Sequence, residues 1–367
     1  MSQVSIAATA SILPPAVISN REIAERLIAG ANLGEGGAGV IHETRARAEL
    51  IEKKTGLRER RFFEPTENPA DVGADLLERL MEDGAWGELD AVIVSSSSTQ
   101  GFPGISQQLV TIAKGKHPEL GNPFVLDIGS NACTGFMYAL TVGASLIKGM
   151  GYRKVAVIAV EFASRCISYD PLSFGTSTLF GDASAGVLLQ PGEGGIAELR
   201  EVRASSMLDE SLIGLIKGSG MQASRPDLEV PASVRWFMAG PPVAIGATKI
   251  LTEEIRRYQE AGDEIDWLIP HQANLTRILI PACKTVGLDP AKLRHTFGET
   301  GNTSSASIPL ALDILVREEK LEKGQTALMV GFGASFTIGS AMLVFTGVGG
   351  KAGATETAEP VPVEATA

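Results

Sequence analysis

Residues 124–160 read FVLDIGSNACTGFMYALTVGASLIKGMGYRKVAVIAV, and this stretch decides the fold class. An apolar run, Phe124 to Ile128, precedes a helical pattern from about Cys133 to Lys148, and a second β-rich run, Val155 to Val160, follows. A strand, a helix and a strand in this order are typical of α/β proteins, whose buried strands read as continuous Val, Ile and Ala runs. We therefore expect an α/β fold with a mostly parallel sheet covered by helices on both faces.

The same order of elements occurs a second time nearer the C-terminus. The first copy begins with a strand at Ala91 to Ser96 and a helix near Ile105 to Ala113. The second copy contains, in order, a strand at Trp267 to Pro270, helices near Leu275 to Val286 and Ala306 to Glu319, and a strand at Ala327 to Val330. A repeated order of elements indicates internal duplication. We expect an N-terminal half at 1–190, a C-terminal half at 191–348, and a disordered tail at 349–367, which is rich in Pro, Ala, Thr and Glu.

The composition is that of a globular protein. Of 367 residues, 44% are hydrophobic and 20% are charged, which excludes a disordered, coiled-coil or collagen-like chain. The formal charge of −11 disfavours nucleic acid as a partner, because phosphates are repelled. The three cysteines are too few for a disulfide framework, and neither a signal peptide nor a membrane span is evident, so we expect a cytoplasmic protein.

Cys133 is the first candidate for chemistry. It follows the predicted strand Phe124 to Ile128 and begins a long helix, where the helix dipole favours the thiolate form of a cysteine. A small buried cysteine is nevertheless more often part of the core than a nucleophile. We interpret Cys166 and Cys283 as core residues.

Two residues of the second copy hold related positions. His271 directly follows the strand Trp267 to Pro270, where α/β sheets present groups to ligands. Asn302 stands in the second copy where Cys133 stands in the first, so we expect the two to meet across the duplication. The chain has four histidines, and none has zinc-ligand spacing with a cysteine, so we expect no metal site and no bound cofactor.

Four ordered motifs carry a family resemblance. The segments NACTGF (131–136), PHQAN (270–274), GNTSSAS (301–307) and GFGAS (331–335) together resemble condensing enzymes of the thiolase superfamily. Among these, the chain is most similar to 3-oxoacyl-acyl-carrier-protein synthase III. The resemblance implies a five-layered αβαβα thiolase-like fold, a homodimer and a Cys-His-Asn triad made of Cys133, His271 and Asn302.

The resemblance also implies a reaction. The cysteine takes an acyl group from an acyl-coenzyme A or acyl-carrier thioester, and the product forms by decarboxylative Claisen condensation with malonyl-acyl carrier protein. Backbone N–H groups of Cys133 and Ala334 would form an oxyanion hole. Phe102 resembles the residue that crosses the dimer to close the partner's acyl pocket, and Phe174 is assigned to the acyl pocket as well. Fatty-acid initiation and a specialised fatty-acid or polyketide pathway both remain open.

The chain departs from the family pattern at the donor site. Where initiating synthases sandwich the adenine of coenzyme A between a tryptophan and an arginine, Leu50 and Phe174 stand here. Two hydrophobic residues replace the stacking of an indole and a planar cation only in part. The departure favours longer or unusual acyl donors over acetyl-coenzyme A.

Basic residues offer a docking site for an acidic carrier protein. Arg277 and Lys284 match carrier-contacting positions of the relatives, and Arg58 extends the patch. The region 29–61 carries seven basic residues among glutamates, a pattern typical of a solvated helix face, with binding of an anionic partner as the alternative.

Two other reactions stay open. An acyltransferase would pass the Cys133 acyl group to an alcohol or amine, but such a reaction needs no enolate stabiliser such as Asn302. A non-decarboxylative condensation of two acyl thioesters requires a carboxylate base, and Glu161, at a predicted strand end, is the nearest candidate.

Overall fold

The computed structural model describes residues 3–31, 37–82, 84–99, 101–207, 216–217, 235–318, 321–333 and 336–347. The proposed tail at 349–367 and Ala334 lie outside these residues. Within the described ranges, none of the helices combines the length and apolarity needed to cross a bilayer.

The strands form one nine-stranded sheet with two halves. The N-terminal half contains β1 (Val4–Ile12), β4 (Leu89–Ser95), β5 (Phe124–Ile128), β6 (Lys154–Glu161) and β7 (Ala183–Pro191). The C-terminal half contains β8 (Ala197–Ser206), β11 (Trp267–Pro270), β12 (Thr326–Phe332) and β13 (Thr337–Phe345). The order across the sheet is β11-β12-β13-β8-β1-β7-β6-β4-β5. The halves join between β1 and β8, where Ser5 pairs with Glu198 and Ile6 with Ala197.

The expectation of a mostly parallel sheet is wrong. Strand β4 runs parallel to β5 and β6, and β11 runs parallel to β12, as the duplicated units predict. The contacts of β7 with β6 and β1, and those of β13 with β12 and β8, are antiparallel. Strands β12 and β13 are separated by only a few residues, which cannot provide the long crossover that a parallel pair requires.

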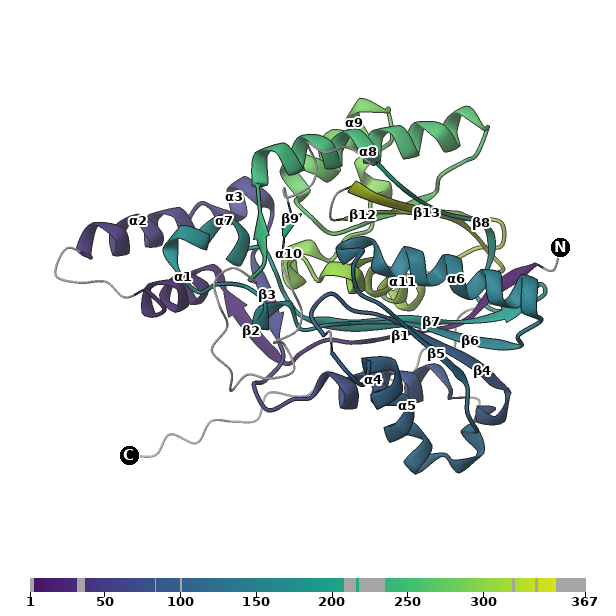
Figure 1. Cartoon of the computed structure of the whole chain (residues 1–367). Helices are drawn as coiled ribbons and strands as arrows, with labels where there is room; N and C mark the ends of the chain where they lie inside the picture. The colour runs from purple at the N-terminus through teal and green to yellow at the C-terminus, as the bar shows by residue number, and fades with distance from the viewer. Residues whose placement is uncertain are drawn as a thin grey trace.

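Helices and sheets alternate in five layers (Figure 1). The outer faces of the two halves are covered by α4 (Pro69–Leu80) and α5 (Ile105–Lys116), and by α8 (Gly240–Glu260) and α9 (Ile280–Thr285). Helices α6 (Gly135–Met150) and α11 (Ser307–Glu318) form the middle layer between the two parts of the sheet. The five-layered αβαβα expectation is confirmed.

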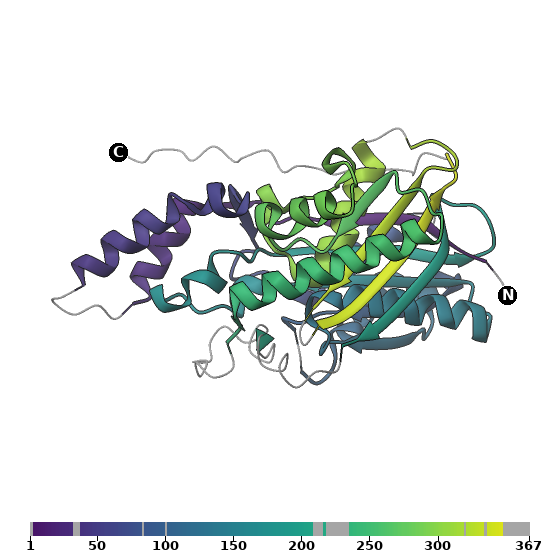
Figure 2. The same ribbon diagram turned by 90° about the horizontal axis from the view of Figure 1, so that it is seen from above.

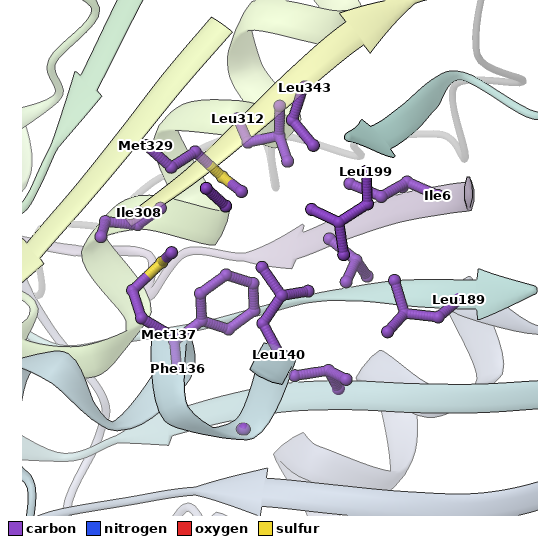
Figure 3. Close-up of a cluster of buried hydrophobic side chains, with 14 of the residues drawn as sticks. Ile6, Phe136, Met137, Leu140, Leu189, Leu199, Ile308, Leu312, Met329 and Leu343 are labelled. Carbon is purple, nitrogen blue, oxygen red and sulfur yellow. The ribbon is translucent and has the colours of Figure 1, made fainter. Parts of the chain in front are cut away.

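The largest apolar core fills this middle layer. Phe136, Met137 and Leu140 of α6 meet Ile308 and Leu312 of α11, and strand side chains close the cluster from both sides (Figure 3). These five side chains are almost completely removed from solvent. Burial of each contributes about 1.5–3 kcal/mol of hydrophobic free energy, so the core fixes the relative position of the two helix N-termini.

An N-terminal helical arm projects from one side of the layers (Figures 1 and 2). It consists of α1 (Asn20–Ala29), α2 (Ala38–Ala48) and α3 (Ile51–Thr55), and its base is the antiparallel pair β2 (Ala16–Ser19) and β3 (Glu59–Phe62). The remaining named elements are α7 (Phe174–Ser177), α10 (Phe297–Thr300), β9 (Ile216–Lys217) and β10 (Phe237–Met238).

The solvated-face interpretation of this arm is wrong for Arg60. Arg60 lies on β3, is fully buried, and donates hydrogen bonds to Ile18 O, Asn20 Oδ1 and Thr178 O. Burial lowers the pKa of Arg60 to about 10. The interpretation is correct for Arg45, an exposed residue that pairs with Glu25 at 2.7 Å.

Candidate active site

Cys133 stands at the junction of strand β5 and helix α6. It occupies a short 3-10 turn, Ala132–Thr134, immediately before α6. The preceding residue, Ala132, has a φ of 47°, which is rarely adopted by a residue with a side chain and stores strain at this turn. The predicted placement of Cys133 at the head of a helix is therefore confirmed.

The thiol is not poised as a thiolate, contrary to the expectation from the helix dipole. Burial is the main cause that raises the pKa of Cys133 to about 12; the charge of Glu161 adds to the rise, and the polar side chains of Ser304 and Asn302 offset part of it. Loss of solvation at this position outweighs the favourable field of the helix N-terminus. Cys133 is a protonated thiol at neutral pH.

Asn302 meets Cys133 across the two halves of the chain. Asn302 is buried, and its backbone bridges to the other half: Asn302 N donates to Leu179 O at 2.8 Å, and Gly181 N donates to Asn302 O at 3.0 Å. Its side-chain oxygen accepts the N–H of Ser304 at 2.8 Å. This bond orients the amide, so the NH2 group is free to donate toward the site.

His271 follows β11 and belongs to the same cluster. Its Nδ1 lies 2.8 Å from Ser307 Oγ, and its ring packs edge-on against Phe332, with centroids 5.1 Å apart. Burial lowers the pKa of His271 to about 3, so the imidazole is neutral at physiological pH. A hydroxyl that donates to Nδ1 leaves the proton of the ring on Nε2, and this tautomer is a hydrogen-bond donor.

The segment from Asn302 to Ser307 collects the three predicted residues. The turn Ser304–Ala306, which follows Asn302, packs against the turn that holds Cys133, and Ser307 contacts His271. The turn at Gly333 also packs on the cysteine turn, because a Cβ at Gly333 would collide with Thr134 Oγ1 and Asn131 O. Among the described residues, no group of three or more His, Cys, Asp or Glu side chains is arranged as a metal site.

A cavity of about 300 Å³ leads from the surface to Asn302. Its basic lining residues are Arg47, Lys54 and Arg277, and Phe174 and Met238 form apolar parts of its wall. The guanidinium of Arg47 lies 4.1 Å from the centroid of the Phe174 ring. The cavity is therefore positively charged at its mouth and polar at its base.

Arg47 supplies a planar cation beside Phe174. The sequence comparison considered only Leu50 and Phe174 at the donor site and did not identify Arg47. Leu50 precedes α3, is 40% exposed and is not among the residues that line the cavity. Arg47 is on α2, one helical turn before Ile51, which also lines the cavity. Arg47 and Lys54 both line the cavity, and binding of an anionic partner by the 29–61 region stays a prediction.

The other predicted site residues lie apart from the cysteine. Phe102 is fully exposed on the loop before α5. Lys284 is exposed on α9, and Arg58 is an exposed residue that forms an ion pair with Glu299. Ser304 and Ser307 were not singled out from the sequence, because a serine within GNTSSAS is as consistent with helix capping as with contact to a catalytic group.

The chain is similar to 3-oxoacyl-[acyl-carrier-protein] synthase III proteins in sequence and in structure. Residues 126–206 match the model for 3-oxoacyl-[acyl-carrier-protein (ACP)] synthase III, and residues 255–345 match the model for its C-terminal part. The β-ketoacyl-[acyl-carrier-protein] synthase III of Pasteurella multocida (strain Pm70) is 31% identical over 300 residues, which cover 81% of this chain and 90% of that protein.

Two solved structures extend the likeness to the whole fold. The 3-oxoacyl-(acyl carrier protein) synthase III of Pseudomonas aeruginosa PAO1 superposes with a TM-score of 0.76 at 25% identity, covering 94% of this chain and 98% of that chain. The priming β-ketosynthase of the R1128 polyketide biosynthetic pathway superposes with a TM-score of 0.74 at 28% identity, covering 94% and 96%.

Proposed function

Because the chain belongs to the 3-oxoacyl-[acyl-carrier-protein] synthase III family, we propose that Cys133, His271 and Asn302 catalyse its reaction, with Cys133 as nucleophile. The enzyme is a condensing acyltransferase that joins a cysteine-bound acyl group to malonyl-acyl carrier protein with loss of CO2. The observation that carries the assignment is the packing of the turn that follows Asn302, Ser304–Ala306, against the turn of Cys133, Ala132–Thr134, from the opposite half of the chain.

The first half-reaction loads the enzyme. The sulfur of Cys133 attacks the carbonyl of an acyl thioester, the donor leaves as a thiol, and the proton of Cys133 passes to that leaving sulfur. The high pKa of Cys133 means that deprotonation accompanies attack rather than preceding it. A covalent acyl-enzyme divides the condensation into two steps.

The second half-reaction forms the new bond. The bond between the malonyl carboxylate and its α-carbon breaks, CO2 leaves, and the electron pair forms an enolate. Neutral His271, through Nε2–H, and the Asn302 NH2 group donate hydrogen bonds to the enolate oxygen. The enolate carbon then attacks the acyl-cysteine carbonyl, and the Cys133 sulfur leaves and regains a proton.

The cavity supports a phosphorylated thioester arm as the substrate. Arg47, Lys54 and Arg277 ring its mouth, and Asn302 is at its base. An acyl-coenzyme A and an acyl carrier protein both present such an arm. Arg277 also borders a surface groove with Lys249 and Arg256, which supports docking of an acidic carrier protein at this face. Lys284, next to the lining residue Thr285, and Arg58 are proposed as further carrier contacts.

A homodimer is the proposed assembly. Strand β5 is at the edge of the nine-stranded sheet, and Phe124 on it is exposed, as is Phe102 on the preceding loop. An unpaired edge strand with an exposed apolar side chain offers a surface for pairing with a second copy.

The three cysteines are unbridged, which supports a reducing compartment such as the cytoplasm.

Intact-protein mass tests the proposal. The enzyme and a Cys133→Ala variant are incubated with acyl-coenzyme A and acyl-carrier thioesters of increasing chain length, and then with malonyl-acyl carrier protein. We expect adducts on the unmodified enzyme alone, cleared with release of CO2. Adducts cleared only by an alcohol or amine would favour the simple acyltransferase, and equal labelling of the variant would reject Cys133 as the nucleophile.

A further inference from the structure

Glu161 is a buried carboxylate beneath the two catalytic turns. It is the last residue of β6 and has no exposed surface. None of the ion pairs among the described residues includes it. Its negative charge is nevertheless close enough to the Cys133 thiol to raise the pKa of that thiol. A buried carboxylate without a cation is costly, so the groups around it must stabilise it.

Five hydrogen-bond donors surround the carboxylate, and they come from both halves of the chain. From the N-terminal half, Ser97 N donates at 3.1 Å, Ser98 N at 3.2 Å and Ser98 Oγ at 2.9 Å. From the C-terminal half, Ser305 N donates at 3.3 Å and Ser305 Oγ at 2.5 Å. Ser98 Oγ accepts from Phe162 N at 2.8 Å, which directs its hydrogen to Glu161.

This donor set matches an ionised carboxylate. Burial raises the pKa of Glu161 above its usual value, and hydrogen bonds from Ser305, Ser97 and Ser98 offset only part of that rise. Three of the five donors are backbone N–H groups, which can only donate, so the geometry favours the charged carboxylate. Glu161 therefore has no free lone pair directed at a substrate, which argues against its use as the base of a non-decarboxylative condensation.

Ser305 connects Glu161 to the catalytic asparagine. Ser305 belongs to the turn Ser304–Ala306, and the N–H of the adjacent Ser304 orients the Asn302 side chain. Ser304 has a φ of 50°, so this turn is in a conformation that the surrounding contacts must enforce. The same turn packs on Gly135, two residues beyond Cys133, where a Cβ would meet Ser305 Cβ at 3.6 Å.

We propose that Glu161 is a positioning residue: its carboxylate ties the Ser305 turn to the Ser97–Ser98 turn and thereby holds Asn302 opposite Cys133. The inference rests on the proposed function, because it assigns the enolate step to Asn302. The proposal predicts a larger effect on one half-reaction than on the other. Loading of Cys133 depends on Asn302 less than condensation does.

The test separates the two half-reactions in Glu161→Gln. Glutamine has nearly the same shape as glutamate, but its NH2 group cannot accept a hydrogen bond. The N–H and hydroxyl donors of one of the two serine turns therefore lose their acceptor. We expect acylation of Cys133, followed by intact mass, to fall less than about threefold, and single-turnover condensation of pre-acylated enzyme with malonyl-acyl carrier protein to fall about 10- to 100-fold. Loss of the charge also moves the pH profile of iodoacetamide labelling of Cys133 to lower pH, which a merely structural role would not do.

Ser305→Ala and Ser98→Ala provide a matched pair if Glu161→Gln does not fold. Each removes one hydroxyl from the same carboxylate, but only Ser305 is in the turn of Asn302. We expect Ser305→Ala to lower condensation more than acylation, and Ser98→Ala to lower both equally. Equal losses in both half-reactions for Ser305→Ala, or an unchanged condensation rate in Glu161→Gln, would overturn the proposal. A wild-type enzyme that acylates but never condenses would instead reject the proposed function.

Discussion

Ser307 Oγ lies 2.8 Å from Nδ1 of His271, and the N–H of Gln272 donates to the same hydroxyl at 3.3 Å. Because the backbone N–H occupies one lone pair of the oxygen, the Ser307 hydrogen is free to point at the imidazole. When the Ser307 hydroxyl donates to Nδ1, the ring proton is on Nε2, and the imidazole donates from that nitrogen. A neutral histidine stabilises an enolate only in that tautomer.

Ser307→Ala should therefore slow condensation by about tenfold, since the imidazole is then free to adopt the unproductive tautomer. Single-turnover condensation measures the effect, and acylation of Cys133 should remain within about twofold of wild type. In a His271→Ala background the serine substitution should cost nothing more. Additive losses in the double variant would contradict the coupling.

His271 should also make stability depend on pH. Its folded pKa of about 3 is below the usual value of 6.5, so the unfolded chain binds a proton that the folded protein excludes. Stability is full above pH 6.5 and is lost as pH falls toward 3. Between pH 7 and pH 5 this residue should remove about 2 kcal/mol from the free energy of unfolding.

Denaturant unfolding of wild type and His271→Asn at both pH values isolates the contribution. The difference between the two proteins is needed because burial also lowers the pKa of His295 and raises that of Asp182 to about 7, with opposite effects on the pH dependence. Identical pH dependence in the two proteins would show that His271 is not buried as a neutral ring.

Alkylation should report the contact between Asn302 and Cys133. The Asn302 side chain lowers the pKa of the thiol, so Asn302→Leu should slow iodoacetamide labelling of Cys133 several-fold at pH 8. Cys133→Ala identifies labelling at the two remaining cysteines, which are buried. Faster labelling in the asparagine variant would mean that Asn302 shields the thiol rather than bonding to it.

Arg47 should govern donor binding. It stacks on Phe174 at the mouth of the cavity, and Arg47→Met should raise the KM for the acyl thioester about tenfold, equivalent to about 1.4 kcal/mol, with little change in kcat. Arg45→Met is the matched control, because Arg45 is on the same helix but pairs with Glu25 outside the cavity. An equal rise in KM for both substitutions would mean that the weaker donor binding results from the change in net charge alone.

Arg60→Met should destabilise the fold by about 3 kcal/mol, because it leaves buried acceptors at Ile18 and Thr178 without a donor. The partly exposed Arg61 next to it pairs weakly with Glu59, at 3.8 Å, so Arg61→Met should change the free energy of unfolding by no more than about 0.5 kcal/mol. Thermal or denaturant unfolding measures both. Equal stability of the two variants would contradict the structural role of Arg60.

Local patterns predicted the elements that carry the proposed catalytic residues. The strands Phe124–Ile128 and Trp267–Pro270 have the predicted bounds, because each is a short apolar run between turn residues. The helix predicted from Leu275 begins instead as a π-helix, Leu275–Leu279, before α9. The meeting of Cys133 and Asn302 followed from the duplication, since equivalent turns of two similar halves face one another.

Contacts that depend on the path of the whole chain were not predictable. The burial of Arg60 depends on the pairing of β2 with β3, and its neighbours in sequence are charged like those of a solvated helix. The raised pKa of Cys133 depends on the burial of its thiol by the folded chain. The division at residue 190 and the dimer contact of Phe102 remain predictions.

Strand β1 sets a constraint on how the protein is made. It lies in the middle of the sheet, and both of its neighbours, β7 at Ala183–Pro191 and β8 at Ala197–Ser206, come from the centre of the chain. At about 5–20 residues per second, the ribosome needs roughly ten seconds or more to deliver them. Throughout that interval the nascent chain carries an apolar strand with two unpaired edges, so chaperone contact early in translation is the expected safeguard against aggregation.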